Sequence, residues 1–327
     1  MNRRDFLRLV GVAGLLFPVA RVASGWVPDV RIHGERRTLV TRQVFVMGSV
    51  FHFHLLTPDE KSAWQDLNRV VARLRFLESV WSVYLPESDL SRLNASAGTD
   101  PVTVDSSTRR LLETAKELHA LSGGLFDLTV EPVMRLFGFR KDPDQLIDRP
   151  TDKELAALES AIGIGNVETK GSLAALRNGM SAVDPGGIGC GLALDESVSM
   201  LRSAGHDRAF LNFSGDVFAL GSDPDENGWE VEILNPTIPD KNEILRIRDT
   251  ALSTSGAYEN RRGNGLVSWG HIIHPQHRRP EEPVQSVTVV AKSATMADGL
   301  STAAFLKPDL LPVWKSSGYL TDFSILL

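Results

Sequence analysis

The sequence predicts an α+β protein in which helices and sheets form separate layers. Helical signals fill the first half of the chain, where apolar residues recur at spacings of three and four. Beyond residue 205 the pattern changes to short apolar runs separated by glycine, aspartate, asparagine or proline. Because the two signals do not alternate regularly, a layered α+β arrangement is favoured over a βαβ winding.

Size and composition indicate an ordinary folded protein. The 327 residues, of which 42% are hydrophobic, suffice for one large domain or two small ones. No segment is a linker long enough to require a boundary, so we expect one domain over residues 38–327. The net charge of −6 argues against a sequence-independent nucleic-acid binder. Cys190 is the single cysteine, which excludes an internal disulfide and a multi-cysteine metal site.

The first 25 residues have the pattern of a twin-arginine export signal. Arg3 and Arg4 precede a weakly hydrophobic run at residues 9–20, and small residues follow it. The run is too short to span a bilayer, so no stable transmembrane anchor is expected after cleavage. We therefore expect the mature protein in the periplasm.

The mature chain begins with a strand-like segment at residues 38–56. His52 and His54 alternate with Phe51 and Phe53, so the two histidines face one way. A His-x-His pair can bind a metal, but without a third ligand a solvated strand face is favoured.

The first predicted helix follows directly. Thr57 and Glu60 have the spacing of a capping box, and Pro58 occupies the first helical position. An apolar stripe with helical spacing continues to Trp81, which predicts a helix packed on the core.

Two further helices are predicted before the centre of the chain. One begins after Asp105 and ends at residues 122–124, where two glycines stop it. The other starts at Thr151, with Glu154 at the capping-box spacing. The charged, proline-containing residues 141–150 between them predict a surface loop. Five strands are predicted in the second half of the chain, at residues 210–213, 217–220, 229–234, 267–269 and 284–290.

Residues 183–195 contain four glycines within six positions, followed by an apolar stripe with helical spacing. The segment predicts a strand, a glycine turn and a helix that ends near Gly205. Such a turn presents free N–H groups at the positive end of a helix dipole, where phosphate can bind. The glycine spacing matches neither a Rossmann motif nor a P-loop. From the pattern alone, an ordinary tight connection is favoured over a phosphate site.

Asp298 and Thr302 lie four residues apart on one face of a predicted helix, with Ser301 beside them. A carboxylate and a hydroxyl at this spacing provide half of an oxygen-ligand site suited to Mg²⁺ or Ca²⁺. The alternative is that Asp298 caps the helix and Thr302 faces outward, and spacing alone favours this alternative.

His271 and His274 lie three residues apart at the edge of a predicted strand. Histidine is the natural general base at neutral pH. A zinc site would need more nitrogen or sulfur ligands than the chain plainly supplies. A single histidine is more often structural than catalytic, so the pattern alone does not assign a role.

Eight motifs occur in one order along the chain. They are Met47–Ser49, Ser82–Tyr84 with Ser88–Asn94, Ser122–Thr129, Val183–Asp195, Asn212–Asp216, Ser253–Gly256, His271–Pro275 and Ala297–Thr302. In sequence and order they resemble the FAD:protein FMN transferase family, also called the ApbE-like flavin transferases. The resemblance implies an ApbE-like (T-fold-like) layered fold with mostly antiparallel sheets flanked by helices.

The resemblance also implies an activity. Members of the family split FAD at its pyrophosphate, attach FMN through a phosphoester to a serine or threonine hydroxyl of a client protein, and release AMP. For this chain it implies FAD as substrate, Mg²⁺ as cofactor, and a client flavoprotein or redox-complex subunit as partner. The chain has no acceptor segment of the Asp-Ser/Thr-Gly-Ala type, which argues against self-modification.

Site residues follow from the motifs position by position. By resemblance, Asp298, Ser301, Thr302 and the backbone carbonyl of Gly187 would form the Mg²⁺ site. His271 would accept the proton of the client hydroxyl. The positions that match FAD contacts are Met47, Tyr84, Gly124, Leu125, Phe126, Asp184, Cys190 and Ile272.

The chain departs from the family pattern at four places. Cys190 stands where the family often has lysine, and His274 stands where it often has aspartate. His277 and Arg278 replace the usual Thr-Gly, and Ser301 replaces a second aspartate of some members. Two alternatives therefore stay open: a flavin-binding accessory protein of a respiratory enzyme without transferase activity, and an FAD pyrophosphatase.

Cys190 has two interpretations of its own. At the first turn of a helix, the dipole would lower the thiol pKa and leave a partial thiolate beside the pyrophosphate. Alternatively, Cys190 is a small buried residue and backbone N–H groups alone hold the phosphates, which is favoured because free cysteine is usually buried.

The export signal gives a first prediction. Replacing both Arg3 and Arg4 with lysine should leave the precursor in the cytoplasm, because the paired arginines are the recognised feature. Fractionation of cells that express the two forms measures this. Unchanged delivery to the periplasm would contradict the twin-arginine interpretation.

Overall fold

The computed structural model describes residues 29–32, 35–142, 144–223, 227–235, 237–238 and 241–327. The predicted export signal at residues 1–25 lies outside these residues. Within the described part of the chain, no helix combines the length and the apolar character that crossing a bilayer would require.

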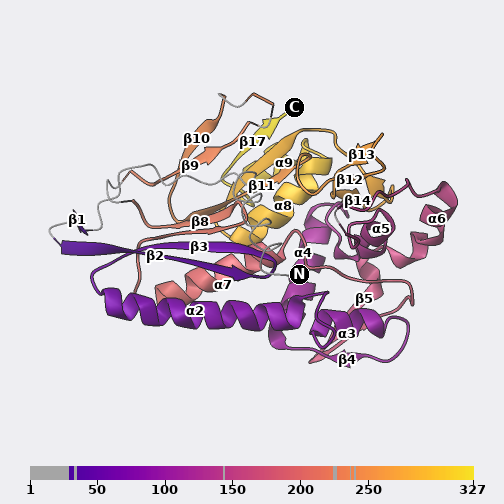
Figure 1. Cartoon of the computed structure of the whole chain (residues 1–327), viewed down its shortest axis with the longest axis horizontal. Coiled ribbons are helices and arrows are strands. Elements are labelled where there is room, and N and C mark those ends of the chain that lie inside the picture. Colours follow the sequence, from indigo (N-terminus) through magenta and orange to yellow (C-terminus); the bar gives the residue numbers. More distant parts are fainter. Residues whose placement is uncertain (1–28, 33–34, 143, 224–226, 236, 239–240) are drawn as a thin grey trace.

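An eight-stranded antiparallel sheet forms the centre of the fold (Figure 1). Its strands, in spatial order, are β1 (Asp29–Ile32), β2 (Glu35–Val46), β3 (Ser49–Thr57), β7 (Ala209–Phe213), β8 (Asp216–Leu220), β11 (Thr250–Gly256), β16 (Ser286–Ala291) and β17 (Asp322–Leu326). The strands come from both halves of the sequence, so the sheet joins the N-terminal hairpin to the C-terminal strands. The layered, mostly antiparallel α+β fold is confirmed.

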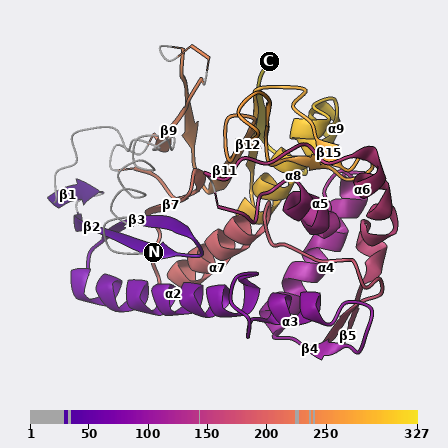
Figure 2. The ribbon, with the colours of Figure 1, turned by 45° about the vertical axis from the view of Figure 1, so that its right-hand side comes forward.

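Helices cover one face of the sheet. The helices are α2 (Glu60–Trp81), α3 (Asp89–Ala95), α4 (Ser106–Leu121), α5 (Glu131–Leu136), α6 (Asp152–Ala157), α7 (Gly189–Ser203), α8 (Ala294–Leu306) and α9 (Leu310–Ser316), with 3₁₀ turns at Leu128–Val130, Glu159–Ala161 and Ile164–Asn166. Helix α8 packs on β11 and β16, α7 packs on α8, and α2 packs on α7. Figure 2 shows α4, α5 and α6 gathered at the end of the molecule away from β1.

Four small sheets complete the structure. They are β4 (Val102–Thr103) with β6 (Leu173–Leu176) and β5 (Val167–Lys170), β9 (Trp229–Ile233) with β10 (Glu243–Ile247), β12 (Arg262–Gly263) with β13 (Ser268–Trp269), and β14 (Ile273–His274) with β15 (Arg279–Pro280). The β14–β15 hairpin begins directly after His271 and Ile272, so it is part of the surroundings of the predicted catalytic histidine.

The strand alternation divides the core between the two faces of the sheet. In β7, Leu211 and Phe213 belong to the core under the helices, whereas Phe210 faces the opposite side and packs with Trp229 of β9. Side chains alternate along a strand, so neighbouring residues enter different cores. The predicted strands at 210–213, 217–220, 229–234, 267–269 and 284–290 all correspond to strands of the structure.

The segment predicted as one strand at residues 38–56 is instead a hairpin. Met47 and Gly48 both have positive φ, 52° and 78°, and form the two-residue turn between β2 and β3. Positive φ at both central residues is the conformation that such tight hairpins require. The prediction missed this turn because methionine rarely takes the first of these positions.

The start of α2 also differs from the prediction. Asp59, not Thr57, is the N-cap, and its carboxylate accepts a hydrogen bond from the Ser62 backbone N–H. Three predictions are confirmed: α2 ends at Trp81, α4 begins after its Asp105 cap, and α6 has the Thr151 capping box.

The histidine face of β3 is less open than predicted. His52 and His54 are both half-buried, and burial lowers the pKa of each, to about 4 for His54. The solvated-face interpretation is therefore wrong for His54. Both rings are neutral at pH 7, and among the described residues they belong to no cluster that could hold a metal.

Helices α7 and α8 cap each other. Asp195 of α7 accepts hydrogen bonds from the backbone N–H groups of Ala294 and Thr295 at the start of α8, at 2.8 and 3.0 Å. In return, Asp298 of α8 accepts one from the Gly191 N–H in the first turn of α7, at 3.1 Å. The side chain at α7's own N-cap position makes no such bond. Each helix therefore fixes the start of the other.

Gly191 permits this close approach. A Cβ at this position would lie 2.6 Å from the Ala294 carbonyl oxygen and 2.7 Å from the Thr295 Cα, closer than packed atoms allow. Both are backbone atoms and cannot turn aside. The helix crossing thus requires glycine here.

The mutual capping predicts a stability effect. Asp195→Ala should lower the free energy of unfolding by about 2 kcal/mol, because the first turn of α8 loses its carboxylate acceptor. Urea denaturation of both forms measures the difference. Asp309→Ala is the matched control, since Asp309 is at the N-cap position of α9 without a side-chain capping bond, and it should change stability by less than about 0.5 kcal/mol. Equal effects of the two substitutions would contradict the capping role.

Candidate functional site

The glycine turn before α7 is held by a side chain rather than by a strand. Asn94 of α3 donates to the Val183 carbonyl at 2.9 Å and accepts from the Val183 N–H at 2.8 Å. Residues 177–184, between β6 and the turn, contain no strand, so the predicted strand–turn–helix order is wrong in its first part. The amide of Asn94 makes the two hydrogen bonds that a strand partner would make. The prediction that a helix follows the turn is confirmed by α7, which ends before Gly205.

The turn brings Gly187 against α8. Gly187 has a φ of 80°, and a Cβ built on it would lie 3.1 Å from the Thr302 hydroxyl oxygen and 3.1 Å from the Phe126 ring. The backbone of Gly187 therefore lies directly beside Thr302. A side chain at position 187 would be strained and would occupy this space.

Asp298 and Thr302 lie on consecutive turns of α8, on one face as predicted. The capping alternative for Asp298 is wrong, because Ser293 caps α8 and Asp298 instead holds the N-terminus of α7. The Thr302 hydroxyl donates to the Asp298 carbonyl at 3.3 Å. The carboxylate of Asp298, the Thr302 hydroxyl and the Gly187 backbone could form an oxygen-only ligand set, which suits a hard cation such as Mg²⁺.

Ser301 faces the sheet. Its hydroxyl lies 2.9 Å from the Ser255 Oγ and 3.3 Å from the Ser253 Oγ, and it donates to the Asp298 carbonyl. The side chain is fully buried. Ser301 thus connects α8 to β11, about one helical turn after Asp298.

Carboxyl groups gather around Asp298. Burial raises the pKa of the Asp298 carboxyl well above its usual range, and the nearby Asp216 raises it further. Burial likewise raises the pKa of Asp216, which the Ser253 hydroxyl opposes and Glu259 reinforces. Ionising several buried carboxyls is costly, and a bound cation would relieve the repulsion among them. This environment therefore fits a metal ion held by Asp298.

Cys190 lies in the first turn of α7, as predicted, but its thiol is not activated. Burial raises its pKa well above the usual value, and Asp216 and Asp298 raise it further. The interpretation of a partial thiolate is therefore wrong. The thiol packs against the main core as a small neutral group, which is the favoured alternative.

Four of the predicted flavin contacts belong to or pack on the main core, and two of them, Phe126 and Met47, reach the glycine turn. Leu125, Phe126 and Ile272 are buried in the main core, and Met47 packs against it. The Met47 methyl group would lie 3.9 Å from a Cβ on Gly189, so Met47 reaches the start of α7. Its backbone N–H donates to the Glu78 carboxylate at 2.8 Å, which fixes the hairpin turn over α2.

Arg140 links two other predicted flavin contacts. Its guanidinium forms an ion pair with Asp184 at 2.5 Å, donates to the Tyr84 hydroxyl at 3.2 Å and contacts Glu131 at 3.3 Å. Tyr84 itself is exposed, so its ring is free to contact a ligand. Sequence reasoning missed Arg140, since a single arginine before a charged loop carries no distinguishing pattern.

His271 is held as a neutral base. Burial lowers its pKa, so the ring is neutral at pH 7. Its Nδ1 lies 3.3 Å from the Glu259 carbonyl oxygen, which can only accept a hydrogen bond. Nδ1 is therefore the protonated nitrogen, and Nε2 carries the lone pair. His274, the second histidine of the motif, does not share this environment but stacks on His277.

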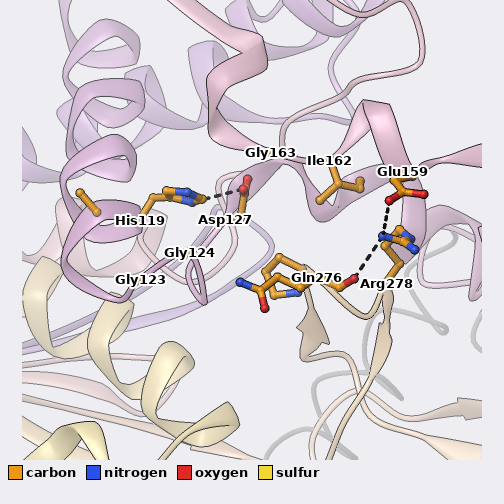
Figure 3. A pocket seen from close by; sticks show the side chains of 11 residues that line it. His119, Gly123, Gly124, Asp127, Glu159, Ile162, Gly163, Gln276 and Arg278 are labelled. Carbon is orange, nitrogen blue, oxygen red and sulfur yellow. Dashed lines mark hydrogen bonds and ion pairs between the residues drawn. The ribbon is translucent and has the colours of Figure 1, made fainter. Parts of the chain in front are cut away.

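A cavity of about 640 Å³ opens beside these segments. Figure 3 shows its walls: Gly123 and Gly124 on one side, Gln276 and Arg278 on the other, and a His119–Asp127 pair behind them. Gly124 precedes the predicted contacts Leu125 and Phe126, and Gln276 follows the segment of His271. The cavity therefore lies between two chain segments that carry predicted site residues.

Fold and site together are those of a flavin transferase of the ApbE type. The model of the ApbE family matches residues 47–312. The chain belongs to the ApbE family.

Relatives agree in sequence and in structure. The FAD:protein FMN transferase of Vibrio cholerae is 31% identical over 75% of this chain and 73% of its own length, and that of Treponema pallidum is 32% identical over 79% and 74%. The solved structure of the flavin transferase ApbE from Vibrio cholerae superimposes with a TM-score of 0.76 at 27% identity, over 88% of this chain and 93% of that one.

The half-buried Glu259 gives a prediction for pH. Burial raises its pKa to about 7, so from about pH 4.5 upward the unfolded state ionises before the folded state does. The free energy of unfolding therefore falls as the pH rises from about 4.5 to 7, by up to about 3 kcal/mol, because the folded state holds the Glu259 proton more tightly than the unfolded state does. Gln cannot ionise. Glu259→Gln should therefore gain stability relative to the parent protein between pH 5 and pH 8.

Thermal denaturation of the parent protein and Glu259→Gln in metal-free buffer, at pH 5 and at pH 8, measures this gain in stability. Glu117→Gln, an exposed glutamate on α4, is the control and should show the same difference from the parent at both pH values. A pH-independent difference for Glu259→Gln would contradict the raised pKa.

Proposed function

We propose that the protein transfers FMN from FAD to a serine or threonine hydroxyl of an exported client redox protein and releases AMP, with Mg²⁺ as cofactor. One observation carries the proposal. The glycine turn places the Gly187 backbone beside Thr302, and Asp298, which accepts a hydrogen bond from Gly191, lies near a further carboxyl in an environment that fits a hard cation. Membership of the ApbE family supports it independently.

Asp298, Thr302 and the Gly187 carbonyl would hold the Mg²⁺. When bound, Mg²⁺ supplies charge neutralisation and Lewis-acid polarisation of the pyrophosphate. Ser301 would support the site by holding α8 against β11, since its hydroxyl bonds to the α8 backbone and to the serines of β11. The expected row of free N–H groups is wrong for this turn, because those of Gly186, Gly189 and Gly191 donate to Asp184, the Pro185 carbonyl and Asp298. The positive end of the α7 dipole would attract the phosphate oxygens instead.

His271 would act as the general base. Its Nε2 accepts the proton of the client hydroxyl while the hydroxyl oxygen forms a bond to the FMN phosphorus. The bond between that phosphorus and the bridging oxygen breaks, and the bridging oxygen leaves with AMP. The neutral ring and the Nδ1 bond to the Glu259 carbonyl prepare His271 for this role.

The flavin would be positioned by apolar and aromatic groups. Ile272, next to His271, and the pair Leu125 and Phe126 are buried apolar side chains that would lie behind the flavin, and Tyr84 presents an exposed ring. Arg140 holds Asp184 and Tyr84 in one arrangement. Cys190, where the family often has lysine, contributes packing without charge. The phosphates would therefore depend on the metal and on the positive end of the α7 dipole.

The proposed site of action is the periplasm. The twin-arginine signal pattern at residues 1–25 supports it, because this type of signal exports proteins that have already folded. A client flavoprotein or redox-complex subunit would then be modified on the same side of the membrane.

The central test uses purified protein, FAD, Mg²⁺ and a candidate acceptor peptide. Mass spectrometry should detect AMP and a peptide that carries FMN. Asp298→Ala should lower AMP release by at least ~100-fold, because a major electrostatic stabiliser of the reaction is lost. Asp309→Ala is the control and should keep full activity, because Asp309 is at the start of α9, lacks a capping bond and is not one of the proposed metal ligands.

Three outcomes would contradict parts of the proposal. AMP and free FMN without modified peptide would indicate a pyrophosphatase. FAD binding without any AMP would indicate a flavin-holding protein. Full activity of Asp298→Ala in the presence of EDTA would contradict the metal site.

A further inference from the structure

The β14–β15 hairpin carries a second cluster of metal-ligand side chains. His274, His277 and Glu281 each offer one ligand atom, and these atoms all lie within 4.8 Å of one another. No other group of three or more metal-ligating histidine, cysteine or acidic side chains occurs among the described residues. The cluster is separate from the oxygen-ligand set on α8.

Hairpin geometry explains the arrangement. His274 pairs with Arg279 across the hairpin, so His274 and Glu281 are on the same face of the two strands. The connecting turn closes through Arg278, whose φ is 56° and whose N–H donates to the His274 carbonyl at 2.8 Å. The turn brings the His277 ring over His274, with 3.8 Å between ring centroids.

Contacts within the cluster occupy one nitrogen of each histidine. The His277 backbone N–H donates to His274 Nδ1 at 3.4 Å. His277 Nδ1 lies 2.5 Å from the Glu281 carboxylate. The two arginines of the turn are directed elsewhere: Arg279 contacts Asp152, and Arg278 contacts Glu159 and the Gln276 carbonyl. Among the described ion pairs, Glu281 pairs with His277 alone.

We propose that His274, His277 and Glu281 bind a divalent transition-metal ion such as Zn²⁺. Two imidazoles and one carboxylate select zinc, cobalt, nickel or copper over magnesium and calcium. Three protein ligands leave a fourth position for water, as in open zinc sites. The inference does not depend on the proposed transferase activity.

The side chains differ in their freedom to move. His274 is 8% exposed and provides a fixed ligand, whereas the side chains of His277 and Glu281 are 56% and 33% exposed. Tetrahedral zinc ligands lie about 3.3 Å apart, given Zn–N distances of about 2.0 Å. We expect the exposed His277 ring to rotate out of the stack on metal binding, because a solvent-exposed side chain changes rotamer more readily than the buried His274.

Metal binding would have a local consequence. It would tie the turn to the end of β15 and so fix the hairpin whose residues Pro275 and Gln276 line the cavity. The same hairpin begins directly after His271 and Ile272. The ion would therefore stabilise the wall of the cavity next to the proposed general base.

The test is a zinc titration of tag-free protein against a chromophoric zinc chelator, in excess Mg²⁺ so that oxygen-ligand sites are occupied. We expect one tightly bound Zn²⁺ per chain. His277→Ala and Glu281→Gln should each weaken binding by at least ~10-fold, since loss of even an outer partner of a ligand has such an effect. Co²⁺ should give visible absorption bands that both variants lose.

Two controls make the result specific. His52→Asn removes a half-buried histidine outside the cluster and should bind zinc like the parent protein. Asp298→Asn should also keep zinc binding, which separates this site from the one on α8. Circular dichroism checks that the variants fold. Binding of less than one equivalent, unchanged affinity of both cluster variants, or loss of zinc in Asp298→Asn would overturn the proposal.

Discussion

The mutual capping of α7 and α8 is the interaction on which the rest of the site depends. Two aspartates, each on one helix, accept hydrogen bonds from the N-terminal backbone of the other. Helix N-termini have unpaired N–H groups, so the two helices satisfy each other where neither has a complete local cap. Gly191 allows the contact because any side chain there would overlap the α8 backbone.

The mutual capping of α7 and α8 determines three features of the site. It directs the Asp298 carboxylate toward the start of α7, it places the glycine turn against Thr302, and it buries Asp298 near Asp216. The burial is unfavourable in the absence of a cation, since it raises the pKa of both carboxyls. We infer that the protein retains this unfavourable group because a metal ion binds there, in keeping with the tendency of perturbed pKa values to mark functional sites.

The sequence predicted well those features that depend on local patterns. The stripe of α2, the Asp105 and Thr151 caps and the five short strands follow from periodicity and capping chemistry. The Asp298–Thr302 face followed in the same way, because four residues make about one turn of helix. Motif order then connected these local features into a family and a layered fold.

The missed features depend on contacts between distant residues. Asn94 replaces a strand partner for Val183, 89 positions away, and Arg140 pairs with Asp184, 44 positions away. No local pattern marks either residue. The cap of α2 was assigned to Thr57 although Asp59 makes the bond, since two capping residues stand close together. The raised pKa of Cys190 was also unpredictable, because it depends first on burial and then on two aspartates brought in by β8 and α8.

The His274 cluster illustrates the same limit. Sequence reasoning considered His271 with His274, but the hairpin instead joins His274 to His277 and Glu281. The positive φ of Arg278 closes the turn that brings these three side chains together. Arginine rarely adopts a positive φ, so the sequence does not predict this turn. The departure from the family pattern at His277 and Arg278 was visible, but its geometry was not.

The most direct test of the account is the position of the metal. A crystal of the protein with FAD and Mn²⁺, measured at the manganese absorption edge, should show an anomalous peak within about 2.3 Å of the Asp298 carboxylate, the Thr302 hydroxyl and the Gly187 carbonyl. The mutual capping of α7 and α8 should remain in place around it. A peak at another position, with Asp298 still bonded only to Gly191, would contradict the central claim.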